Sequence, residues 1–204
     1  LIKTKLFGIL STLYFRANLN DSGGTPSIVH KSFFNNCDDY PTDFSFDVFV
    51  YYFYRKRKKT IIRPKIKYTK RFAGENFTEF NEILDSINTE DIKFLFLDNG
   101  SYENNIKDYF SDKSYENRKL ISSDKNLGYG GGIIYAQNFI NSDFIAWMPG
   151  NLKINPQDSV AFFMNAYHLL SENTLIKAKR INRQILDLIK TKLFGILSTL
   201  YFRA

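Results

Sequence analysis

The stretch FLFLDNGS, residues 94–101, decides the fold that we expect for this chain. Its four large apolar residues run without a break, as in a strand buried on both faces of a parallel sheet that helices cover. Asn99 and Gly100 then predict a turn directly after the strand. Ligands of open α/β sheets bind outside the carboxyl ends of the strands, so Asp98 is a candidate ligand contact. The alternative is that Asp98 only caps the helix that follows.

Composition and charge limit the classes of protein that fit. The chain has 204 residues, enough for one good-sized core or at most two small domains. Its 44% apolar and 24% charged residues are typical of a globular protein in water. The net charge of +7 favours anionic partners, namely nucleotide phosphates, acidic lipid surfaces or nucleic acid.

Cysteine and histidine are scarce. The single Cys37 excludes an intrachain disulfide and a cysteine cluster for metal, and it fits a reducing, cytoplasmic compartment. Because His30 and His168 are the two histidines, we expect no multi-histidine metal site. No apolar run reaches the roughly 20 residues that a membrane-spanning helix needs, so we expect no transmembrane segment, and nothing resembles a signal peptide.

The two ends of the sequence are identical. Residues 1–17, LIKTKLFGILSTLYFRA, recur without a change at residues 188–204. Structural repeats diverge in sequence and stand in tandem, whereas this identity is confined to the ends. It is the pattern of a closed ring that is read once around and then past its start. We therefore expect a permuted or rearranged order of segments, with the repeat as an amphipathic helix that packs on a core.

An aromatic segment, SFDVFVYYFY at residues 45–54, leads into five consecutive cations at 55–59. Asp43 and Asp47 are four residues apart, so the segment is interpreted as a helix that presents acids on one side. Two interpretations of the cations stay open. They are either the solvated end of this helix, where positive charge is favoured, or a contact with anionic lipid headgroups.

A glycine-rich segment, DKNLGYGGG at residues 124–132, precedes an apolar run that predicts a helix. Glycines let the backbone approach a ligand closely, and anions are favoured at a helix N-terminus. The spacing matches neither the P-loop nor the dinucleotide fingerprint, so the segment indicates a phosphate site only weakly.

The other expected elements follow from periodicity and from turn residues. They are strands at 61–68 (confined by Pro64 to an edge or a strand start), 119–122 and 144–148, and helices at 77–87, 102–110 and 158–170.

Three of these features together resemble glycosyltransferase family 2, whose members have the GT-A fold and use nucleotide-sugar donors. They are the strand that ends in DNGS, the KNLGYGGG loop that opens a helix, and the strand at 144–148 followed by a turn and Asn155-Pro156. The subgroup that the chain resembles most acts on polyprenyl-phosphate acceptors and is of the dolichyl-phosphate mannosyltransferase type. The resemblance implies a single α/β domain with a central, mostly parallel sheet flanked by helices.

The resemblance covers nearly the whole chain, but in an altered order. Residues 76–187 resemble the first half of the family, the terminal repeat continues it, and residues 18–75 resemble the second half. This order agrees with the ring that the repeat suggests.

Two features of the family are missing. Its first strand, an apolar run that ends in Pro and Asn, has no counterpart before Phe77. The Asp-x-Asp pair that binds Mg²⁺ or Mn²⁺ should follow Trp147, where the chain has Pro149-Gly150-Asn151. Hard cations prefer carboxylate oxygens, so we assign no metal ligands and expect donor binding to depend little on metal. Mg²⁺ or Mn²⁺ stays open as a cofactor, although the Asp-x-Asp pair is absent.

The resemblance implies roles for individual residues. Asp21 would be the base if the acceptor is a sugar hydroxyl, and an ionised lipid phosphate would need none. Cations would stabilise the leaving diphosphate or bind an acceptor phosphate. The nucleotide-sugar residues would be Asp98, Asn99, Gly100, Ser101, Asn126, Gly128, Gly130 and Asn151, and the cations Lys70, Arg71, Lys179 and Arg180, with the other cations of 177–183 beside them and Arg71 also catalytic.

Three functions are weighed. The first is transfer of a hexose from a nucleotide sugar to a polyprenyl phosphate or another cell-envelope glycan acceptor, at the cytoplasmic face of a membrane. The second is a rearranged, inactive fragment that at most binds a nucleotide, because a strand and the metal pair are missing. The third, nucleic-acid binding, draws on charge alone and ranks last.

Overall fold

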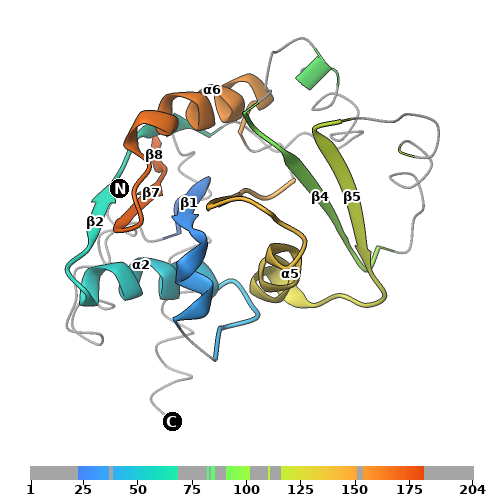
Figure 1. The fold of residues 1–204 in the computed structure, drawn as a ribbon, viewed down its shortest axis with the longest axis horizontal. Coiled ribbons are helices and arrows are strands. Elements are labelled where there is room, and N and C mark those ends of the chain that lie inside the picture. Colours follow the sequence, from blue (N-terminus) through green and yellow to red (C-terminus); the bar gives the residue numbers. More distant parts are fainter. Residues whose placement is uncertain are drawn as a thin grey trace.

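The computed structural model describes residues 23–36, 39–68, 82, 84–85, 91–101, 110, 116–150 and 154–181. These residues form helices packed against small β-sheets (Figure 1).

The largest sheet has four strands in the order β2-β7-β1-β6. These strands are β1 (Ser27–His30), β2 (Thr60–Ile62), β6 (Phe144–Trp147) and β7 (Thr174–Lys177). β2 pairs with β7 in parallel, whereas β1 is antiparallel to both of its neighbours. The sheet thus interleaves strands from residues 23–68 with strands from residues 144–177, so distant parts of the sequence share one core.

A short parallel ribbon extends the β2–β7 pair. It consists of β3 (Lys65–Lys67) and β8 (Lys179–Ile181), and Lys65 lies opposite Lys179. The ribbon keeps the register of β2 and β7, so the expected strand at 61–68 is one strand interrupted at Arg63 and Pro64. Proline lacks an N–H for the ladder, but the Pro64 carbonyl still accepts a hydrogen bond from the Lys179 N–H at 2.7 Å. β2 is an edge strand, as the proline predicted.

The FLFLDN stretch forms β4 (Phe94–Asn99), which pairs in parallel with β5 (Arg118–Ser123). Both strands and their parallel direction were expected. The burial was not, because the four apolar residues of β4 are only half-buried. α5 packs against one side of β4. Phe94 and Phe96 of β4 cluster with Leu84, Met148 and Val160. The prediction of a strand buried on both faces is therefore wrong.

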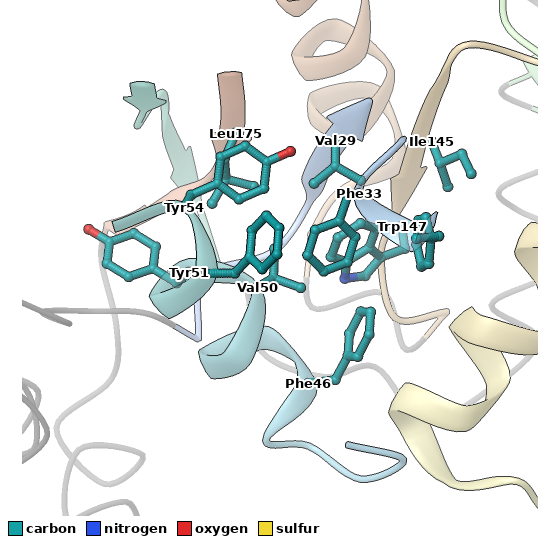
Figure 2. Packing of buried hydrophobic residues seen from close by; sticks show 11 residues of the cluster. Val29, Phe33, Phe46, Val50, Tyr51, Tyr54, Ile145, Trp147 and Leu175 are labelled. Atoms are coloured by element: carbon teal, nitrogen blue, oxygen red, sulfur yellow. The ribbon is translucent and has the colours of Figure 1, made fainter. Parts of the chain in front are cut away.

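One face of the four-stranded sheet carries the aromatic core. α2 (Phe46–Lys56), the 3-10 helix η1 (Lys31–Asn35) and α5 (Gly128–Gln137) supply side chains that pack on this face. Figure 2 shows the rings of Phe33, Phe46 and Trp147 grouped beneath Val29 and beside Val50. The apolar periodicity of α2 explains its position, since the residues at helical spacing are the buried ones.

The opposite face is covered by α6 (Pro156–Ala166), which continues into the 3-10 helix η2 (Tyr167–Leu169). Phe162 and Ala166 pack there against Ile28 and Ile176. The adjacent residues on the same strands, Val29 and Leu175, face the aromatic core on the other side of the sheet. Asn155 caps α6 by accepting a hydrogen bond from the Gln157 N–H, and Pro156 follows in the first turn. The sheet therefore lies between two helical layers, as in α/β proteins.

The expected α/β class is confirmed, but a mostly parallel central sheet is not, because β1 runs against both neighbours. The helix expected at 158–170 begins earlier, at Pro156. In the two other expected helices, Glu82, Leu84, Asp85 and Phe110 are helical. The remaining residues of those helices and the terminal repeat lie outside the described residues.

Candidate functional site

The carboxyl ends of β4 and β5 lie side by side, with Asp98 opposite Ser122 and Asn99 opposite Ser123. Asp98 is 4% exposed, and its Oδ1 accepts a hydrogen bond from the Ser101 N–H at 2.9 Å. This bond closes the turn at Gly100, where φ is 74°. Within the described residues, the contact of Asp98 is thus a local cap, and its contact with a ligand stays a prediction.

Asn99 fastens this strand end to the glycine-rich loop. Its Oδ1 accepts from the Leu127 N–H at 3.0 Å, and its Nδ2 donates to the Gly128 carbonyl at 3.0 Å. One side chain therefore holds the loop in a fixed position at the end of β4. Asn126, which is exposed, contributes a second local bond by accepting from the Gly128 N–H at 2.8 Å.

Gly128 begins α5 and requires glycine for two reasons. Its φ of 76° lies in the left-handed region, and a Cβ there would lie 2.5 Å from the Thr42 carbonyl oxygen. Gly130 also sits against the chain, since a Cβ there would overlap the Pro41 carbonyl oxygen. The glycines permit a close backbone approach, as predicted, but the described group that approaches is the 41–43 segment.

Two N–H groups in the first turn of α5 already donate hydrogen bonds within the chain. Gly128 donates to Asn126, and Gly131 donates to the Thr42 carbonyl at 2.9 Å. In the described part of the chain, the N–H groups of Tyr129 and Gly130 donate to no acceptor. The turn therefore keeps two of the donors that attract anions to helix N-termini.

A buried polar network lies behind this loop, and we did not predict it from the sequence. Lys177 is fully buried, and its Nζ donates to Asp47 Oδ1 and to Ser27 Oγ, each at 2.8 Å. Trp147 Nε1 donates to Asp47 Oδ1 at 3.3 Å, and the Tyr129 hydroxyl donates to Asp47 Oδ2 at 3.0 Å. Asp47 thus joins α2 to β6, β7 and the first turn of α5.

Burial shapes the protonation of this network. It lowers the pKa of the Lys177 ammonium, although the neighbouring Asp47 carboxylate acts in the opposite direction. It raises the pKa of the Tyr129 phenol, and the charge of Asp47 raises that pKa further. The phenol therefore stays protonated at neutral pH and keeps its role as a donor to Asp47.

Contrary to the prediction from the sequence, the aromatic helix does not present Asp43 and Asp47 together on one side. Asp47 lies in the first turn of α2 and is buried in the network. Asp43 precedes α2 and accepts hydrogen bonds from the hydroxyl and the N–H of Ser45. These bonds hold the pKa of the Asp43 carboxyl below its usual range.

The cations predicted to bind phosphate also differ in their surroundings. Lys179 is exposed, and the Arg180 guanidinium lies 5.8 Å from the centre of the Tyr68 ring. Lys177, which was grouped with these cations, is buried against Asp47, so the structure does not leave it for a phosphate. Asp21, Lys70, Arg71 and Asn151 lie outside the described residues, and their roles stay predictions.

Among the described residues, no three His, Cys, Asp or Glu side chains form a group that could hold a metal ion. No helix within the described ranges is long and apolar enough to cross a membrane. No family model, curated protein or solved structure matches this chain.

Proposed function

We propose that this chain is a rearranged glycosyltransferase domain of the family 2 type. In this proposal it binds a nucleotide sugar at the carboxyl ends of β4 and β5, beside the first turn of α5. It transfers the hexose to a polyprenyl phosphate or another cell-envelope glycan acceptor at the cytoplasmic face of a membrane. The observation that carries the proposal is the Asn99 side chain, which joins the strand end to the glycine-rich loop through two hydrogen bonds.

This junction has the chemistry that a nucleotide diphosphate needs. The Asp98 carboxylate at the strand end can accept hydrogen bonds from a ribose or a base. The N–H groups of Tyr129 and Gly130, which have no acceptor in the described residues, can donate to a phosphate at the helix N-terminus. Carboxylate and donors thus lie on two segments that Asn99 holds together.

The cations supply the second part of the proposal. Lys179 and Arg180, with Lys70 and Arg71, would stabilise the negative charge of the leaving diphosphate. Asp21 would serve as the base for a sugar hydroxyl, whereas an ionised lipid phosphate needs no base. Strands of the two sequence halves interleave in one sheet, which is the arrangement that a single rearranged domain requires.

The second candidate is a domain that binds a nucleotide without transfer. The contacts of Pro41 and Thr42 with the glycines favour it, because the chain itself occupies part of the space that glycines open for a ligand. Both candidates require the same nucleotide site, so binding is tested before activity.

Calorimetric titration of UDP, GDP and their sugars tests the site, with the wild type compared with Asp98→Asn. The amide oxygen of asparagine can still accept the Ser101 N–H, so this change removes the charge and keeps the turn. We expect about a tenfold loss of affinity, as for one hydrogen bond to a charged group. Equal affinity of both proteins, or no binding by the wild type, would remove the nucleotide assignment.

Transfer is then measured with radiolabelled donors and polyprenyl phosphate as acceptor. Label that moves into the lipid phase supports the transferase. Nucleotide binding without any transfer, over the donors tested, supports the second candidate.

A further inference from the structure

We propose that the cation run at the C-terminal end of α2, Arg55 to Lys59, is the surface by which this chain attaches to an anionic lipid bilayer. The proposal deepens the proposed function, because it names where the chain meets the membrane that holds a lipid-linked acceptor. It rests on that function only for the acceptor, since attachment is measured without donor or acceptor.

The five cations are accessible at the C-terminal end of α2. Arg55, Lys56, Arg57 and Lys58 are exposed, and Lys59 is half-buried. Lys58 adopts a left-handed conformation with φ of 53°, which ends the helix and turns the chain into β2. In Figure 1 this end of α2 lies at one margin of the molecule, next to the edge strand β2.

No carboxylate in the described part of the chain neutralises these charges. The ion pairs between described residues join Arg118 to Asp85 and Lys177 to Asp47, and both lie elsewhere. Burial raises the pKa of the Tyr54 phenol, and the charge of the exposed Glu172 raises it further, so one carboxylate acts on this end of α2 without an ion pair to the cations. Cations are favoured at any helix C-terminus, but five neighbouring cations, none ion-paired to a described carboxylate, form a cluster of the size that binds anionic lipid headgroups.

The cations are held in place by aromatic rings of the same helix. The Arg57 guanidinium lies 3.7 Å from the centre of the Phe53 ring, and Arg55 lies 5.4 Å from that of Tyr51. Lys56 and Lys59 lie 5.6 and 5.7 Å from the rings of Tyr52 and Tyr54. Such contacts attract each cation to its ring and so limit the positions that these side chains adopt.

The same geometry disfavours a nucleic acid. Binding of single strands relies on exposed aromatic faces on which bases stack. Tyr51, Phe53 and Tyr54 are buried in the aromatic core and Tyr52 is half-buried, so this end of α2 offers charge without a fully exposed stacking platform. Attraction to a plane of anionic headgroups needs only the charge. Each cation near the surface increases the partition of the protein onto the bilayer about fivefold.

A second group of cations continues this margin. Lys65 and Lys67 on β3 are exposed, and Lys179, opposite Lys65, is exposed as well. The β3–β8 ribbon extends the β2–β7 pair, and β2 starts directly after Lys59. A bilayer that meets the end of α2 therefore lies next to a strand edge that leads to the proposed phosphate cations.

Co-sedimentation of the full chain with vesicles tests the proposal. The vesicles contain phosphatidylcholine alone or with 30% phosphatidylserine, at low and high salt. The test variant is Lys56→Gln/Lys58→Gln/Lys59→Gln. The matched control, Lys93→Gln/Lys119→Gln/Lys125→Gln, removes the same charge from exposed positions around β4 and β5.

We expect the wild type and the control to bind the anionic vesicles in a salt-dependent manner and to ignore the neutral ones. The test variant should partition roughly 100-fold less, as the loss of three cations implies. Equal binding by the two variants, or no binding by the wild type, would overturn the proposal. So would a test variant that keeps vesicle binding but loses affinity for a single-stranded RNA oligomer, since the surface would then belong to nucleic acid. Donor binding that persists while vesicle binding fails would refute this surface and leave the proposed function standing.

Discussion

Replacing Lys177 with methionine tests the buried network most severely. Methionine has similar length and fills the space, but it leaves the Asp47 carboxylate buried without its counter-charge. Breaking a buried pair by removing one partner costs about 3–5 kcal/mol, which is a large share of the stability of a domain. For a chain of this size, the melting temperature should fall by roughly 6 °C or more. The matched control, Lys179→Met, changes an exposed lysine two residues away and should cost less than about 0.5 kcal/mol.

The double variant Lys177→Met/Asp47→Asn separates charge from packing. Asparagine removes the buried charge, and its Oδ1 can still accept from Trp147 or Tyr129. We expect the double variant to be more stable than Lys177→Met alone, with a coupling energy of about 2 kcal/mol. Urea unfolding of the full chain measures the free energies of unfolding of four proteins: the wild type, Lys177→Met, Asp47→Asn and the double variant. If the effects of the two changes simply add, or if Lys177→Met unfolds like the wild type, the network does not hold the helix to the sheet.

Three further predictions concern a glycine, an acidic residue and the dependence of donor binding on metal. Gly128→Ala should lower the free energy of unfolding by about 1–3 kcal/mol, because φ at this position is positive and a Cβ would press on the Thr42 carbonyl. A Cβ at Gly150 would have nothing within 4 Å, so the control Gly150→Ala should unfold at the same urea concentration as the wild type. Asp43→Asn should lower stability at neutral pH. The folded pKa of Asp43 is depressed below 3.8, so this difference should shrink as the pH falls through that folded value, and a difference that persists at lower pH would contradict the assigned Ser45 bonds. Donor binding should survive EDTA; a loss that Mn²⁺ or Mg²⁺ restores would show a metal site where Pro149-Gly150-Asn151 replaces the family's acidic pair.

The local elements of this fold could be predicted from the sequence. β4 and β6 are short apolar runs bounded by Gly, Asn or Pro, and such runs form strands wherever the core lies. The direction of β1 could not be predicted, because it depends on which neighbours the rest of the chain supplies. The half-exposure of β4 has the same origin, since an apolar run cannot show how completely other elements cover it.

The Asp47–Lys177 pair was missed for a related reason. The two residues are far apart in the sequence, Lys177 stands at the start of a run of cations that suggests a surface, and Asp47 is a lone acid in an aromatic segment. A signal was nevertheless present in the periodicity. Asp47 precedes Val50 and Tyr51 by three and four residues, so it shares their buried helix face. Lys177 is two residues after Leu175 on a strand, so it shares the face that packs on the aromatic core.

The candidate site was predicted in part. Glycine at 128 and 130 indicated a close backbone approach, and the structure has one. Glycine cannot show what approaches, and here the described partner is the Pro41–Thr42 backbone. Asn99 was expected to contact a nucleotide, but its side chain is already bonded to the loop. A ligand at this junction therefore depends on Asp98 and on the remaining donors of α5.

Hydrogen exchange with and without a nucleoside diphosphate tests the central claim most directly, since it locates the site without relying on activity. The proposal predicts slower exchange at Ser101, at Tyr129 and at Gly130 when UDP or GDP is bound, because these amides lie at the junction of β4 and α5. Exchange in β2, the edge strand of the separate four-stranded sheet, should not change. Slower exchange confined to other segments, or no change at saturating nucleotide, would contradict a nucleotide site at the carboxyl ends of β4 and β5.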